Sequence, residues 1–182
     1  SGNDLTGSTY GLELLNMDLA GASITQSMVG IGSGLTGTPL YLESVTNALI
    51  SGLDLSWTGT GKVGSGLVLY SSSNNVVQNV TATNRQQGIY VRDGSSHNTL
   101  QQNNLSGAGD AAIQARDNAA GSTGNRYLNN NLTNSYIALD IRYDTQFVSS
   151  GNDLTGSTYG LVLLNMDLAG ASITQAMVGN GS

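Results

Sequence analysis

The chain ends almost as it begins. Residues 1–33 return as residues 150–182 with an offset of 149. Only three positions differ: Glu13 against Val162, Ser27 against Ala176 and Ile31 against Asn180. A segment that serves as both the first and the last unit of a chain belongs to a repeating architecture, so the repeat is the feature that most constrains the fold.

A shorter, imperfect repeat of about 25 residues runs between these two ends. Its clearest mark is a pair of apolar residues that flank one outward position. The first members of the pairs are Leu12, Leu40, Leu67, Ile89, Ile113, Leu139 and Leu161. A second apolar set lies upstream, at Leu5, Leu35, Leu55, Val80, Leu105, Leu132 and Leu154. A third set lies between the coils, at Ile24, Leu49, Val76, Leu100, Leu128, Val148 and Ile173.

Each period therefore predicts three short strands separated by Gly, Ser and Asn turns. Strands this short bury a face only when they stack on equivalent neighbours. We predict an all-β fold, a single-stranded right-handed parallel β-helix of about seven coils with three strands each, about 34 Å long. The whole chain, 1–182, forms one domain, and 1–33 and 150–182 are its terminal repeats.

Asn or Asp precedes the second apolar position in six of the seven periods. The residues are Asp4, Asp54, Asn79, Asn104, Asn131 and Asp153. Two structural interpretations remain open. The side chains form a hydrogen-bonded ladder between coils, or they are chosen because Asn and Asp tolerate left-handed turns.

Several segments carry a family resemblance: residues 73–80 (SNNVVQNV), 88–93 (GIYVRD) and 98–105 (NTLQQNNL). They resemble the right-handed β-helix repeats of the pectin-lyase-like superfamily, closest to those of mannuronan epimerases and of periplasmic β-helix proteins that handle sugars or copper. The resemblance covers about residues 48–164 and the ends by internal analogy. It implies the fold, but the same repeat serves enzymes and inert scaffolds alike.

Composition narrows the possible partners. The net charge is −6 with only six basic residues, which argues against nucleic acid. No apolar run approaches the roughly 20 residues that a membrane-spanning helix needs. The absence of cysteine and the richness in Ser, Thr, Asn and Gly favour a secreted or cell-surface bacterial protein.

Alternation along the strands places one candidate site on the outer face. Three arginines fall at the same position of consecutive coils, and tyrosines precede them. One interpretation is a surface ladder of Arg–Asp pairs, with Asp93, Asp117, Asp140 and Asp144 as partners. The other is a groove for an acidic polysaccharide, in which arginine binds carboxylate or sulfate. Its candidate carbohydrate-binding residues are Tyr41, Tyr70, Tyr90, Arg92, Arg116, Asp140 and Arg142.

Catalysis is the less favoured interpretation. A lyase or epimerase of uronate polymers needs a cation and a base. The candidates are the three arginines Arg92, Arg116 and Arg142 and the base Tyr90. The Asp-Pro-His signature of the epimerases is absent, however, because the single proline, Pro39, has no histidine near it. A hydrolase would require two carboxylates, such as Asp140 with Glu43 or Asp117.

No cofactor or metal is predicted. His97, the single histidine, lies in a predicted turn without partners. Oxygen ligands for calcium are abundant, but the sequence contains no dedicated calcium loop.

The two ends carry no obvious capping element, so we expect end-to-end self-association. A natural array with a period of 149 residues and an engineered chain both explain the duplication. The leading hypothesis is a non-catalytic scaffold or spacer of a repetitive exported protein, with weak carbohydrate binding along one sheet. The alternatives are a lyase-like or epimerase-like module and a self-assembling solenoid.

Overall fold

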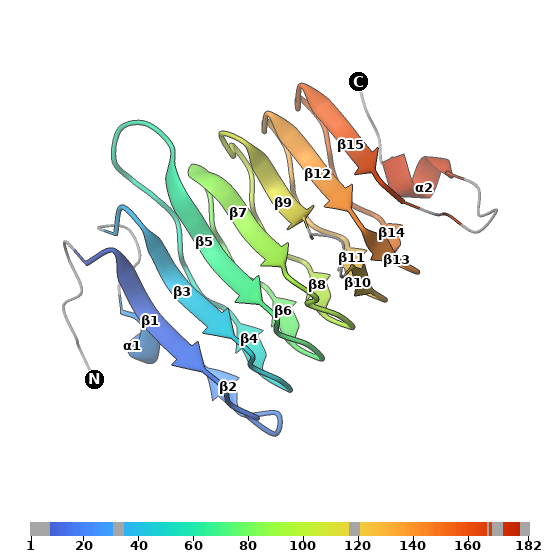
Figure 1. Ribbon diagram of the computed structural model, residues 1–182. Helices are drawn as coiled ribbons and strands as arrows, with labels where there is room; N and C mark the ends of the chain where they lie inside the picture. Colours follow the sequence, from blue (N-terminus) through green and yellow to red (C-terminus); the bar gives the residue numbers. More distant parts are fainter. Residues whose placement is uncertain (1–7, 31–34, 117–120, 167, 169–172, 179–182) are drawn as a thin grey trace.

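The computed structural model describes residues 8–30, 35–116, 121–166, 168 and 173–178. In these parts of the chain, the main sheet contains seven parallel strands stacked in chain order (Figure 1). They are β1 (Tyr10–Leu15), β3 (Thr38–Glu43), β5 (Val63–Tyr70), β7 (Arg85–Arg92), β9 (Ala111–Arg116), β12 (Ile137–Arg142) and β15 (Tyr159–Leu164). The chain passes once through each coil, so the fold is a parallel β-solenoid.

A second parallel sheet forms another side of the solenoid (Figure 1). Within the described residues it has six short strands, β2 (Ser23–Ile24), β4 (Leu49–Ser51), β6 (Val76–Gln78), β8 (Thr99–Gln101), β11 (Arg126–Leu128) and β14 (Val148–Ser150). A separate pair joins β10 (Ser122–Thr123) and β13 (Asp144–Thr145). Two single-turn helices, α1 (Gln26–Val29) and α2 (Gln175–Val178), occur at equivalent positions of the terminal repeats.

The main apolar column has the predicted register. Leu40 pairs with Leu67, Leu67 with Ile89, Ile89 with Ile113, and Ile113 with Leu139. The side chains of all five are fully buried. Stacking therefore produces the continuous apolar interior that none of these strands can form alone.

The small residue before each apolar pair has a packing reason. A Cβ added at Gly88 would lie 2.5 Å from the Ala112 carbonyl oxygen and 2.8 Å from the Leu105 Cβ. A Cβ added at Gly66 would lie 2.5 Å from the Ala82 Cβ. Side chains essentially never approach backbone and core atoms so closely, so these positions require small residues.

Two details of the predicted fold are corrected. The solenoid has about six complete turns rather than seven. Each turn runs from one main-sheet strand to the next, and seven strands have six such intervals. The third side is not a strand in the described residues. It is a column of single β-bridges that connects Asp54, Thr81, Asn104, Asn131 and Asp153.

The third apolar set was placed one residue too early in three coils, at Leu49, Val76 and Val148, and one residue too late in another, at Leu128. The buried middle residues of the second sheet are Ile50, Val77, Leu100 and Tyr127. Leu49, Val76, Leu128 and Val148 lie beside them and are partly or largely exposed. In these four strands one neighbour of the inward residue is apolar, so the apolar pattern alone did not fix the register.

The second apolar set also needs one correction. Leu55, Leu105 and Leu132 occupy one column and Ala82 takes their place in the intervening coil, as the backbone hydrogen bonds from coil to coil show. Val80 is two residues before Ala82 and lies outside that column. Its backbone amide donates to Asn103 Oδ1 at 2.9 Å. Leu5 lies outside the described residues.

The predicted Asn/Asp column is occupied by Asp54, Asn104, Asn131 and Asp153, with Thr81 at the position expected for Asn79. Asn79 instead occupies a turn with φ of 53°. One side-chain bond joins coils in this column, from Asn131 Nδ2 to Asn104 Oδ1 at 3.1 Å. Asp4 lies outside the described residues.

The buried amide ladders lie elsewhere. In one, the side-chain amide of Asn103 donates to Asn130 Oδ1 at 3.0 Å, and that of Asn130 donates to Asn152 Oδ1 at 2.9 Å. In the other, Asn75 donates to Asn98 and Asn98 to Asn125, each at 3.1 Å. The first ladder is one residue before the predicted column, so its side chains point inward rather than outward.

A buried arginine, Arg85, is the first residue of β7, the middle strand of the main sheet. Its Nε donates to the Leu55 carbonyl at 2.8 Å and its Nη1 to the Leu35 carbonyl at 2.7 Å. The guanidinium also stacks 5.8 Å from the Trp57 ring centroid. Burial lowers the pKa of Arg85 to about 10. Carbonyl oxygens thus solvate a cation that the bulk solvent does not reach.

Candidate carbohydrate-binding face

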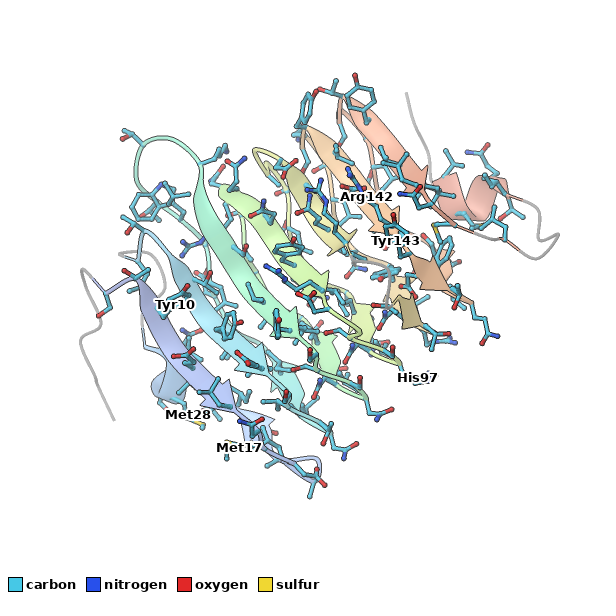
Figure 2. The ribbon with its side chains drawn as sticks, viewed as in Figure 1. Tyr10, Met17, Met28, His97, Arg142 and Tyr143 are labelled. Atoms are coloured by element: carbon cyan, nitrogen blue, oxygen red, sulfur yellow. The ribbon has the colours of Figure 1, made fainter. Side chains whose placement is uncertain are left out.

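The seven candidate residues share one face of the main sheet, from β3 to β12. Strand pairing places Tyr70 beside Arg92, Arg92 beside Arg116, and Arg116 beside Arg142. Tyr41, Tyr90 and Asp140 occupy the neighbouring column. We call these seven residues the outer strip. Arg142 projects from the end of β12 in Figure 2.

The tyrosines form the N-terminal half of the outer strip. The Tyr41 and Tyr70 rings stack with centroids 6.5 Å apart and planes at 25°. The Tyr41 hydroxyl donates to Glu43 Oε2 at 3.4 Å. Burial, together with the nearby Glu43 carboxylate, raises the pKa of Tyr41. These rings are half-buried, so each offers part of its surface to a ligand.

Arg92 joins the tyrosines to the rest of the strip. Its guanidinium lies 5.2 Å from the Tyr70 ring centroid and 5.3 Å from that of Tyr90. Its Nε also donates to Asp93 Oδ2 at 2.6 Å. Burial opposes the charged form, but the bond to Asp93 and the two tyrosines outweigh it and raise the pKa of Arg92. The cation is therefore held in place by its own neighbours.

Asp140 is the centre of the other half. Its side chain is completely buried, although it points to the outer face, because two arginines cover it. Arg142 binds it through both Nε and Nη2, at 2.8 and 2.9 Å. Arg116 Nη2 approaches at 3.3 Å. The hydrogen bond to Asp140 raises the pKa of Arg142. Asp140 thus holds the two arginines in place, and they shield its carboxylate from solvent.

Three polar residues extend this network and were not among the candidates. Gln87 Nε2 and Gln114 Nε2 both donate to Asp110 Oδ2, at 3.1 and 3.2 Å. Gln114 also donates to Asp140 Oδ2 at 3.3 Å. Gln114 lies between Tyr90 and Asp140 in the outer column of the sheet, but it is buried. Register alone identifies Gln114, whereas nothing in the sequence marks Gln87 and Asp110 as its partners.

The expected carboxylate partners of the arginines divide into three cases. Asp93 and Asp140 form the ion pairs just described. Asp144 is buried and accepts hydrogen bonds from the Tyr127 hydroxyl and the Asn125 amide. Asp117 lies outside the described residues.

The hydrolase pairing of Glu43 with Asp140 is incompatible with the fold. Glu43 is on β3 and Asp140 on β12, with β5, β7 and β9 between them. Four strand spacings of about 4.8 Å place them about 19 Å apart. Paired glycosidase carboxylates are roughly 5 to 9.5 Å apart.

His97 is an exposed turn residue with φ of 56°, as the sequence predicted. Figure 2 shows it at a corner of the solenoid, away from Arg142. Among the described residues, no three His, Cys, Asp or Glu side chains are grouped closely enough to hold a metal ion. No helix in the described part of the chain is long and apolar enough to cross a membrane.

The stacked sheets and the outer strip define the class: a parallel β-solenoid whose largest sheet presents an aromatic and charged face. The model of the right-handed β-helix region matches residues 2–169, so the chain belongs to this family. This match confirms the predicted right-handed β-helix. No curated protein and no solved structure matches the chain.

Proposed function

We propose that the chain is a non-catalytic β-helix scaffold that binds carbohydrate along the outer strip. The observation that carries this proposal is that its charged groups already have partners within the chain. Arg92 pairs with Asp93, and Asp140 pairs with both Arg116 and Arg142 while being fully buried. A catalytic acid or base must reach the substrate, and Asp140 does not.

The same pairing favours a neutral glycan over the acidic polymer expected from the arginine stripe. An acidic ligand must compete with Asp93 and Asp140 for guanidinium groups that are already hydrogen-bonded. A neutral sugar needs only an aromatic surface and polar groups at its edge. The stacked rings of Tyr41 and Tyr70 supply the first, and Arg92 beside Tyr70 supplies the second.

The proposed setting is outside a bacterial cell. The support is compositional: the chain has no cysteine and is rich in short polar residues. A solenoid surface that repeats from coil to coil also matches a linear polymer, whose sugar units repeat along its length.

Affinity electrophoresis in gels that contain neutral glucans, mannans or xylans, or polyuronates, tests this proposal. We expect retardation by a neutral polymer that is insensitive to salt. Tyr41→Ala and Tyr70→Ala should each weaken it about threefold to tenfold, since each removes a stacking surface. Tyr136→Ala is the control, because Tyr136 is exposed but outside the outer strip.

Two outcomes contradict the proposal. Salt-sensitive retardation by polyuronates alone would show that the ligand is an acidic polymer. Catalysis would be shown by unsaturated products, detected by ultraviolet absorbance, or by epimerised sugar residues, detected by nuclear magnetic resonance. Either result would mean that the chain is an enzyme and not an inert scaffold.

A further inference from the structure

Both ends of the main sheet are open in the described structure. Among the described strands, β1 pairs only with β3, and β15 pairs only with β12. The inward residues of these end strands, Leu12, Leu14, Leu161 and Leu163, are only partly buried. Their equivalents Leu40 and Leu42 in the next coil are fully buried. Within the described residues, the apolar column is therefore incompletely covered at both ends.

Exposed apolar surface is concentrated at the same two ends. Among the described residues, ten large hydrophobic side chains are exposed, and eight of them belong to the terminal repeats. They are Tyr10, Leu15, Met17, Met28, Tyr159, Leu164, Ile173 and Val178. Figure 2 shows all three of Tyr10, Met17 and Met28 at the N-terminal end of the solenoid, with Tyr10 at the start of β1 and the two methionines toward its other end. A concentration of this kind marks a surface for association.

The duplicated sequence shows that both open edges are competent to pair. In the N-terminal copy, β1 uses one edge, with Leu12 opposite Leu40. In the C-terminal copy, β15 uses the opposite edge, with Leu161 opposite Leu139. Leu12 and Leu161 are the same position of the repeat. Each edge that is free in one copy is therefore paired in the other.

We propose that the partner for these edges is a second copy of this chain, which docks head to tail with β1 against the free edge of β15. The register follows from the repeat: Leu161 lies opposite Leu12 of the second copy, and Tyr159 opposite Tyr10 of the second copy. The strands run parallel, as in the rest of the sheet. Because the two surfaces are different, each addition leaves a new open edge and the assembly does not close.

The tyrosines of the repeat support this register. Tyr10 packs edge-on against Tyr41 at 5.8 Å, and Tyr159 packs edge-on against Tyr136 at 5.4 Å. Each of the two is about half exposed. Docking places these two rings next to each other and continues an aromatic row through the junction.

α2 lies against β14 of the second sheet. We therefore expect the second sheet to contribute less to the docking contact than the main sheet does. α2 contacts β14 and β15, and the Ser149 hydroxyl donates to the Met177 carbonyl at 3.5 Å. Figure 1 shows α2 beside the end of β15. The proposed contact therefore rests on the β15 strand rather than on the second sheet.

One of the three differences between the repeats provides the test. Head-to-tail docking places Val162 opposite Glu13 of the second copy, and Glu13 is exposed. Val162→Lys should strengthen association and Val162→Glu should weaken it, each by up to about fivefold at low salt. Adding Glu13→Lys to Val162→Glu should restore it. Urea unfolding of each variant separates these effects from a change in folding.

Sedimentation velocity over a concentration series gives the readout. The expected result for the unchanged chain is a series of species beyond the dimer, built from 18.7 kDa units. A strict monomer, or a dimer that does not grow, overturns the proposal. If Val162→Lys and Val162→Glu weaken association equally, β15 of one copy pairs with β15 of the other. That result also overturns the proposal.

Strand exchange is the remaining competitor. If β15 displaces β1 of the second copy, position 162 faces Tyr41, as Glu13 now does. Val162→Glu then re-creates the first repeat at this position and does not weaken association. That result overturns direct docking. Carbohydrate binding is measured separately, so the two proposals fail independently.

Discussion

The side-chain amide of Asn130 donates a 2.9 Å hydrogen bond to Asn152 Oδ1 in the neighbouring coil, with both residues almost fully buried. Asn130 Nδ2 also donates to the Leu100 carbonyl at 3.0 Å. Its Oδ1 accepts from the backbone and side chain of Asn103. One amide therefore connects three coils.

Asn130→Ala should lower the free energy of unfolding by about 2 to 3 kcal/mol, because it leaves buried donors and acceptors without partners. The adjacent Asn131→Ala is the control. Asn131 is less buried and makes one bond to another coil, so its loss should cost about 1 kcal/mol. Urea denaturation followed by circular dichroism measures both. Equal losses would contradict the inward ladder.

Arg85→Ala should destabilise the chain by about 3 kcal/mol or more. The substitution removes the donor to the Leu35 and Leu55 carbonyls and leaves a cavity beside Trp57. Arg126→Ala, at an exposed position, should change stability by less than about 0.5 kcal/mol. Thermal unfolding of the two variants distinguishes them. A mild effect at Arg85 would show that its burial is dispensable.

Asp140→Asn should cost about 3 kcal/mol, since a fully buried carboxylate that binds two arginines loses its charge. Asp93→Asn provides the comparison, because its partner Arg92 is 42% exposed and water replaces the lost interaction. That change should cost less than about 1 kcal/mol. Chemical denaturation at pH 7 measures both values, and a larger loss at Asp93 would be inconsistent with the buried network.

Asp153 should make stability depend on pH. Hydrogen bonds from the hydroxyl and the backbone amide of Thr155 lower the pKa of Asp153 in the folded chain. Its contribution is therefore present above the unfolded value near 3.8 and is lost as pH falls through the lower folded value. The stability difference between the unchanged chain and Asp153→Ala should shrink from pH 5 to pH 3. A constant difference would exclude this ionic contribution.

The main sheet was predictable because its inward residues are large, apolar and spaced by two. Leu67, Ile89 and Ile113 are marked by the same pattern in each coil, and period-two burial fixes their register. The outer positions of Arg92, Arg116 and Arg142 follow directly from it. Sequence periodicity thus gave the location of the outer strip.

The ladders and the buried arginine were not predictable in the same way. Asn103 and Asn104 are chemically identical and adjacent, and only the inward direction of the first distinguishes them. Arg85 has the sequence signature of a surface residue, and its burial depends on carbonyls from residues as far away as Leu35. Such contacts arise from tertiary packing that no local pattern records.

The loop before β5 carries a further consequence. It contains Trp57, and it is longer than the corresponding connections, as Figure 1 shows. Even so, Leu67 remains in line with Leu40 on one side and Ile89 on the other. An insertion at this corner leaves the stacked interior unchanged. Evolution can therefore lengthen the surface loops of such a molecule without altering its fold.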